Sequence, residues 1–455
     1  MMNNRTTELR IAYLLLLVSA VCFIVHFLFF RHSFPPVNID EASFFSPAQS
    51  LSKKGVLASD IHKSFLPGSA TYTFWMPPLY ILLLGGVFEV FGSTVIMAKI
   101  LSLALSIASV VMLLSLAKNK FEKIAAAALF LLCPFIIITS AFIRVEALAI
   151  FLTVLAIVAV NKKWSVLLLG VIAGLSVMTH PLMLACGAGL GLTALRRGFK
   201  PLIFFTLSFL IIISPYIWYI MQDVELFKDQ MSLQFLRKSK AKLFDVKPMY
   251  LLQSVPMVLL ALFCLYKVKV ANEFRLFLAF SIVLALAIVL KSNEFNYQVY
   301  LVPYVIAAVV LAMQERKELK LFRWGIPFLL YGFFAVVLLS KLMKYQFRTD
   351  ASYKELVANL ESDKSWNGKH IYETGGPDVA THLLMREQDV ERGIPVPMEL
   401  PQDWFTKYDY VIDVKENISS GDNSNETDTM RPWINWKQTS FTTSDSAYTL
   451  TRYNR

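Results

Sequence analysis

Long apolar runs alternate with short polar loops through the first 344 residues of the chain. A helix needs roughly 20 apolar residues to cross the hydrocarbon core of a bilayer, and the runs that meet or approach this length predict about eleven crossings. The predicted spans are residues 11–30, 98–117, 124–142, 145–160, 164–180, 182–195, 201–220, 250–266, 274–290, 297–313 and 324–342. The pattern therefore predicts an all-α polytopic membrane protein.

The apolar run 77–91 is interpreted differently, because counting it as a crossing would invert every later loop. Basic residues cluster at 118–123, 162–163, 196–200, 267–275 and 316–323. Such clusters gather in cytoplasmic loops. If run 77–91 is an interfacial or re-entrant helix on the external face, all of these clusters share a side with Arg5 and Arg10. We therefore predict a cytoplasmic N-terminus and an external C-terminal tail.

The tail has a different character from the rest of the chain. Residues 345–455 are polar and rich in Asp, Asn, Ser and Thr, with short β-like runs at 369–373 and 408–414. A segment of about a hundred residues is near the lower bound for a domain. The sequence thus predicts a transmembrane domain at 1–344 and a small external α/β domain at 345–455.

Composition supports a membrane location and excludes other classes. Hydrophobic residues make up 56% of the 455 residues and charged residues 17%, which is too apolar for a soluble domain. The net charge of +11 comes from loop residues that set orientation, so no nucleic-acid partner is predicted. The first run is too long for a removable signal peptide and is interpreted as a retained anchor. The four cysteines all lie in apolar runs without paired spacing, which predicts neither a disulfide framework nor a metal cluster.

Two adjacent acids, Asp40 and Glu41, directly follow the first apolar run. Carboxylates at the edge of a membrane are costly to bury and are therefore functional candidates. The residues that follow place Phe44, Phe45, Ala48 and Leu51 at helical spacing, as in an interfacial helix. We expect an amphipathic helix here that holds the acids at the mouth of an external cavity.

Other polar residues at apolar borders fall on the same predicted side: Arg144, Glu146, His180 and Glu294. Two interpretations of Arg144 and Glu146 remain open. The two side chains could form a solvated pair in an external turn, or the guanidinium could grip an anionic group, since its planar fork suits phosphate. His180 precedes Pro181, which ends a helix, so a packing or helix-end role competes with a functional one.

The order of these features resembles the GT-C glycosyltransferases. The resemblance is to the protein O-mannosyltransferase and aminoarabinose transferase group (glycosyltransferase family 39-like), which uses polyprenyl-phosphate sugars. The segments that carry it are 40–42, 77–80, 91–92, 98–100, 144–148, 174–181 and 300–303. Trp75 and Met76 stand where the aminoarabinose enzymes carry a lysine before the proline, so aminoarabinose is not assigned as the sugar.

The resemblance implies an integral-membrane glycosyltransferase. It would move a sugar from a polyprenyl-phosphate donor to a hydroxyl or similar group of a protein, lipid or glycan on the external face. Asp40 would be the general base, with Glu41 beside it, and Arg144 would hold the donor phosphate. The alternative candidates for binding the donor phosphate are Lys53, Lys54 and Lys63. The supporting residues are Glu146, His180 and Glu294.

No metal ligand is assigned, and a divalent metal is left open because the GT-C class contains members of both kinds. The expected location is the plasma (inner) membrane of a bacterium, or the endoplasmic reticulum membrane of a eukaryote. The alternative function is a transporter or flippase of lipid-linked glycans. Inverted repeats and helices broken near the middle of the bilayer, which are typical of transporters, are not seen in the sequence, so the enzyme is preferred.

Overall fold

A computed structural model gives the fold of the chain. It describes residues 2–30, 41–62, 66, 68–239, 248–268, 271–292, 295–316 and 319–344, and in the tail 355–356, 358–360, 362, 368–369, 371–373, 390–392, 410–416, 437–442 and 448–454. The chain divides into two compact units. The helical unit comprises Met1–Leu28, Phe74–Tyr80 and Lys99–Lys344, and the sheet unit comprises Phe29–Thr73, Ile81–Ala98 and Tyr345–Arg455.

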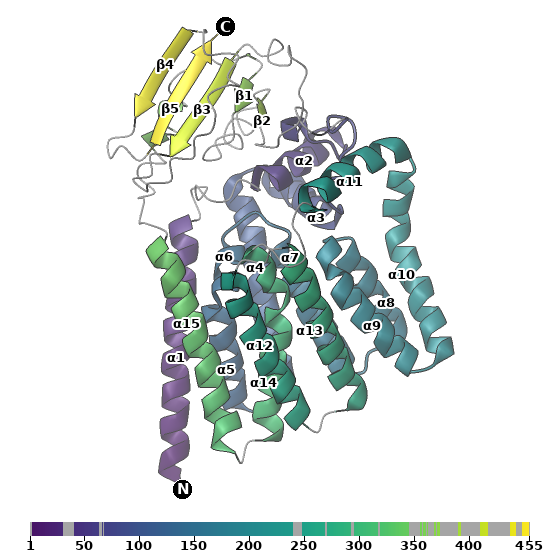
Figure 1. Ribbon diagram of the computed structural model, residues 1–455, viewed down its shortest axis with the longest axis vertical. Coiled ribbons are helices and arrows are strands. Elements are labelled where there is room, and N and C mark those ends of the chain that lie inside the picture. Colours follow the sequence, from purple (N-terminus) through teal and green to yellow (C-terminus); the bar gives the residue numbers. More distant parts are fainter. Residues whose placement is uncertain are drawn as a thin grey trace. The chain divides into compact units, whose positions relative to one another are not determined.

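Every predicted apolar span contains helix, and the span 124–142 is divided between two helices (Figure 1). The helices are α1 (Met2–Phe30), α4 (Val95–Leu113), α5 (Lys120–Leu132), α6 (Pro134–Ser140), α7 (Glu146–Asn161), α8 (Val166–Val177), α9 (Leu184–Arg196), α10 (Phe199–Ile220), α11 (Val224–Ser239), α12 (Pro248–Lys267), α13 (Asn272–Ser292), α14 (Val302–Glu315) and α15 (Ile326–Lys344). Short 3-10 turns η2 (Leu114–Leu116), η3 (Pro181–Met183) and η4 (Phe295–Tyr300) and the π-turn η5 (Leu321–Gly325) adjoin them.

Within the described residues, six helices are long and apolar enough to cross a membrane: Thr7–Leu28, Val95–Leu116, Phe199–Ile220, Asn272–Lys291, Tyr297–Glu315 and Leu321–Ser340. The pair α5 and α6 would add a seventh, but it is bent by 67°. Shorter apolar helices cover the other predicted spans. The chain is therefore a multi-pass helical membrane protein, and the count of about eleven crossings stays a prediction.

Sequence signals account for the boundaries of α5. Asn119 and Glu122 form a capping box at its start, in which the Asn119 side chain accepts a hydrogen bond from the Glu122 N–H at 3.0 Å. The helix ends before Pro134, which has no N–H to donate and cannot continue the α5 ladder. This proline breaks the run 124–142 that the sequence analysis treats as one span.

Helices α8, α9 and α10 lie side by side (Figure 1). Gly170 and Gly174, one turn apart on α8, allow the close approach of α10. A Cβ at Gly170 would collide with the Phe205 carbonyl, and one at Gly174 would come within 2.7 Å of the Ile212 side chain. This small-residue spacing is typical of helix pairs in membranes.

The sheet unit contains α2 (Glu41–Lys54), η1 (Asp60–His62) and most of α3 (Leu79–Phe91). The predicted non-crossing run 77–91 contains α3, whose 13 residues rise about 20 Å. Gly92 follows in the left-handed region at φ +83 and ends the helix. The position of α3 at the membrane face stays a prediction.

The described strands of the tail form one five-stranded sheet. They are β1 (Ile371–Glu373), β2 (Val390–Arg392), β3 (Tyr410–Glu416), β4 (Lys437–Thr442) and β5 (Tyr448–Asn454), in the order β2-β1-β3-β5-β4. Strand β1 pairs in parallel with β2 and β3, whereas β5 is antiparallel to β3 and β4. Strands β1 and β3 overlap the two predicted β-like runs. The domain boundary after residue 344 and the external placement of the tail stay predictions.

Candidate functional site

A buried ion pair occupies the turn between α6 and α7. Arg144 donates from Nε to Oε2 of Glu146 at 3.0 Å and from Nη2 to Oε1 at 2.6 Å. Arg144 is 6% exposed and Glu146 1%. The two side chains therefore do not form a solvated pair. A buried pair needs this two-point geometry, because the attraction must offset the loss of hydration of both charges.

Hydrogen bonds from neighbouring helices fix the same turn. Ser102 on α4 donates from Oγ to the carbonyl oxygen of Phe142 at 2.7 Å, and the Tyr80 hydroxyl lies 3.3 Å from the same Oγ. Tyr80 and Ser102 are both fully buried. The backbone is thus anchored to α4 at Phe142, two residues before Arg144.

Lys99, one turn before Ser102 on α4, is fully buried at 0% exposure. It lies within electrostatic range of His26 on α1. Lys99 belongs to the segment 98–100 that carries the family resemblance, and the sequence predicts no separate role for it. The signal was nevertheless present, because a lysine inside an apolar run is rare in membrane helices and marks a functional candidate.

His180 has a defined structural role between α8 and η3. Its Nδ1 accepts a hydrogen bond from the Leu182 N–H at 3.1 Å, which caps η3. The ring stacks on Tyr300 with centroids 5.4 Å apart and lies 5.6 Å from that of Tyr297. Because η4, which carries both tyrosines, contacts α6 and α7, this aromatic group packs on the helices that flank Arg144.

Glu41 is the first residue of α2 and is fully buried. The predicted helix is confirmed, with Phe44, Phe45 and Ala48 buried and Leu51 half-buried. Its interfacial position stays a prediction. The Phe45 ring packs against Phe88 of α3 at 4.9 Å. The catalytic candidate Asp40 lies outside the described residues, as do Lys63 and Glu294.

The other basic candidates lie at the exposed end of α2. Lys53 and Lys54 occupy the last turn, and both residues are exposed. Lys54 pairs with Asp60 at 2.9 Å. An exposed pair of this kind contributes little free energy because water and salt screen it. Of the described basic candidates, Arg144 alone is buried.

A histidine that sequence reasoning missed supports the start of α2. His62 is buried, with Nδ1 3.0 Å from the Ser59 hydroxyl and Nε2 3.0 Å from the Ser43 hydroxyl. Ser43 lies two residues after Glu41, so His62 ties the first loop to the first turn of α2. No local pattern marks the three residues, because only folding brings them together.

Among the described residues, no three His, Cys, Asp or Glu side chains gather as a metal site would require. The structure therefore assigns no metal ligands in the part of the chain that it describes.

The sequence matches no protein-family model and no curated protein. Solved structures do match. The crystal structure of ArnT from Cupriavidus metallidurans bound to undecaprenyl phosphate has a TM-score of 0.61 at 14% identity, covering 97% of each chain. The apo state of the same protein has a TM-score of 0.62 at 13% identity, again over 97% of each chain. The chain has the fold of ArnT.

At this identity the likeness concerns the fold alone. It extends over nearly the whole chain, and it agrees with the helical membrane architecture predicted from the sequence.

Proposed function

We propose that the chain is an integral-membrane glycosyltransferase that moves a sugar from a polyprenyl-phosphate donor to a hydroxyl or similar acceptor. The observation that carries the proposal is the fold shared over 97% of the chain with ArnT, one of whose structures holds undecaprenyl phosphate. ArnT is a GT-C aminoarabinose transferase, which is the group that the ordered sequence motifs resemble. The sugar is left unassigned because Trp75 and Met76 replace the lysine-containing motif of the aminoarabinose enzymes.

The proposed reaction is a single displacement that inverts the anomeric carbon. The acceptor oxygen forms a bond to that carbon while the bond to the phosphate oxygen breaks. The polyprenyl phosphate leaves with the electron pair. Asp40 takes the proton of the acceptor hydroxyl, the role that general-base catalysis assigns to a positioned carboxylate. Glu41, the next residue and the start of α2, assists Asp40.

Arg144 is the proposed partner of the donor phosphate. The Nε and Nη2 groups of Arg144 bind Glu146. Glu146 thereby fixes the plane of the guanidinium, and an oriented, desolvated cation stabilises a phosphate leaving group better than a mobile surface lysine. We therefore favour Arg144 over Lys53, Lys54 and Lys63, with His180 and Glu294 in supporting positions.

The test is a transfer assay with the purified protein. It would be incubated with membrane extract and a panel of radiolabelled polyprenyl-phosphate sugars, and the products would be separated and counted. We expect one label to become covalently attached to an acceptor, with release of polyprenyl phosphate. Movement of a label across reconstituted vesicles without a new covalent product would replace the enzyme by a transporter or flippase of lipid-linked glycans.

The proposed orientation has a cytoplasmic N-terminus and places the active site and the tail after residue 344 outside, in a bacterial inner membrane. Reporter fusions at Lys120, Arg197 and Asp363 would test it. We expect cytoplasmic signals at Lys120 and Arg197 and an external signal at Asp363, because basic clusters stay in the cytoplasm. The reverse signal at any of these positions contradicts the orientation.

A further inference from the structure

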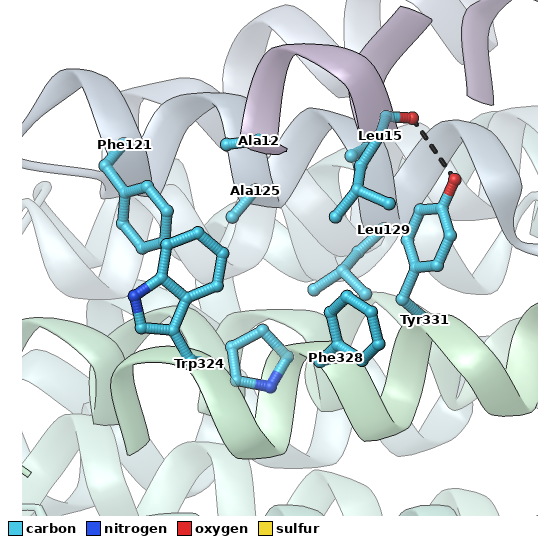
Figure 2. A pocket seen from close by; sticks show the side chains of 10 residues that line it. Ala12, Leu15, Phe121, Ala125, Leu129, Trp324, Phe328 and Tyr331 are labelled. Atoms are coloured by element: carbon cyan, nitrogen blue, oxygen red, sulfur yellow. Dashed lines mark hydrogen bonds between the residues drawn. The ribbon is translucent and has the colours of Figure 1, made fainter. Parts of the chain in front are cut away.

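An apolar groove lies in the helical unit between α1, α5 and the η5–α15 segment (Figure 2). Its walls are formed by aromatic and aliphatic side chains that include Phe121, Trp324 and Phe328, and the small residues Ala12 and Ala125 leave the space between them. The one hydroxyl in the lining, that of Tyr331, donates to the Leu15 carbonyl at 3.2 Å. Apart from the indole N–H of Trp324, the groove therefore offers an apolar surface.

The helices that form the groove present apolar side chains to their surroundings. Leu14 and Leu17 on α1 and Leu329 on α15 are each at least 60% exposed. Both helices contain segments that are long and apolar enough to cross a membrane. In a bilayer these side chains face lipid tails, so a lipid tail can reach the groove from the side.

One end of the groove is aromatic and basic. The rings of Phe121 and Trp324 lie 4.6 Å apart. Arg323 lies over the Phe121 ring at 5.5 Å and also bonds Glu8, and Lys120 lies over the Tyr13 ring at 5.3 Å. Trp, Lys and Arg together are typical of the level of the lipid headgroups.

Further basic residues occupy the same turns. Arg10, Lys123 and Lys320 are exposed on α1, α5 and the start of η5. Glu8 neutralises part of this charge, but basic residues outnumber it. The end of the groove is therefore electrostatically complementary to a phosphate with a net negative charge.

We propose that this groove binds one acyl chain of an anionic phospholipid, with the lipid phosphate beside Lys120 and Arg323. The lining positions on α5 run from Phe121 to Leu129, which is about 12 Å of helix axis. That length fits within one leaflet, half of a core of about 30 Å. A polyprenyl chain is much longer than a leaflet, so the length favours a phospholipid over the proposed donor.

The binding test uses the full-length protein in phosphatidylcholine vesicles and follows Trp324, which lines the groove. The emission of Trp324 is obtained by subtracting the fluorescence of the Trp324→Phe variant from that of the natural protein. Phosphatidylglycerol with a brominated acyl chain should quench this difference signal at lower concentration than brominated phosphatidylcholine. The ratio of the two quenching concentrations should be about fivefold for each basic side chain that contacts the phosphate.

Lys120→Gln should reduce the preference for phosphatidylglycerol about fivefold. Lys162→Gln, which removes an exposed lysine that follows α7, is the matched control and should leave the preference unchanged. Equal quenching by the two brominated lipids in the natural protein overturns the proposal, as does stronger quenching by a brominated polyprenyl phosphate.

Filling the groove is the second arm of the test. Ala125→Phe should abolish the quenching of Trp324, whereas Ala104→Phe, the same substitution at an exposed position of α4, should not. Unchanged quenching in Ala125→Phe contradicts the proposal. If Ala125→Phe fails to fold, as judged by thermal unfolding, the Lys120→Gln comparison decides alone.

Discussion

Asp40→Asn is expected to lower the rate of sugar transfer by roughly 10²–10⁴-fold while donor binding survives. Asparagine keeps the shape and the hydrogen-bonding capacity of aspartate but cannot accept the acceptor's proton. The measurement is the initial rate of label transfer at saturating donor, together with the donor dissociation constant. A loss of rate without a loss of binding is what removal of a proton acceptor predicts.

Two companion variants control for the substitution. Asp60→Asn makes the same change in the exposed pair with Lys54 and should leave the rate near that of the natural protein. Glu41→Gln, at the buried start of α2, should lower the rate less than Asp40→Asn if Glu41 only assists. An Asp40→Asn protein that transfers sugar at the natural rate would remove Asp40 from the mechanism.

Arg144→Ala should weaken donor binding and turnover together, because a phosphate contact serves both the ground state and the transition state. It should also lower the free energy of unfolding by roughly 3–5 kcal/mol, since the buried Glu146 carboxylate loses its partner. Donor affinity, transfer rate and denaturant unfolding in detergent are the three measurements.

A double variant separates the two effects. Arg144→Gln with Glu146→Gln removes both buried charges and should recover much of the stability, while donor binding stays weak. Recovery of donor binding in the double variant would mean that Arg144 serves the fold rather than the phosphate. Arg197→Ala, which breaks a partly exposed pair with Glu273, should cost less stability and leave donor binding intact.

Most of the helical architecture follows from the apolar runs themselves. The predicted span 201–220 differs from α10 by two residues at its start, because a long run between polar loops defines its own ends. The break between α5 and α6 was missed, although Pro134 inside the run was a sufficient signal. The run 124–142 is long enough for one membrane span, and this length favoured a single helix in spite of Pro134.

The candidate site was predictable only in part. Arg144 and Glu146 are two residues apart, so their proximity was expected, whereas their burial depends on helices distant in sequence. The contacts of His62 with Ser43 and Ser59 join loop and helix positions that share no periodicity. Burial and hydrogen bonds between separate elements arise from the packing of the folded chain, so they cannot be read from a single sequence.

The short length of α8 has a consequence for the membrane around it. Its 12 residues rise about 18 Å, while its neighbour α10 has 22 residues and rises about 33 Å. If α8 crosses as predicted, hydrophobic mismatch thins the bilayer beside it, at a cost of a fraction of a kcal/mol per Å. The mismatch grows with the thickness of the bilayer, so the protein should be less stable in membranes of longer-chain lipids.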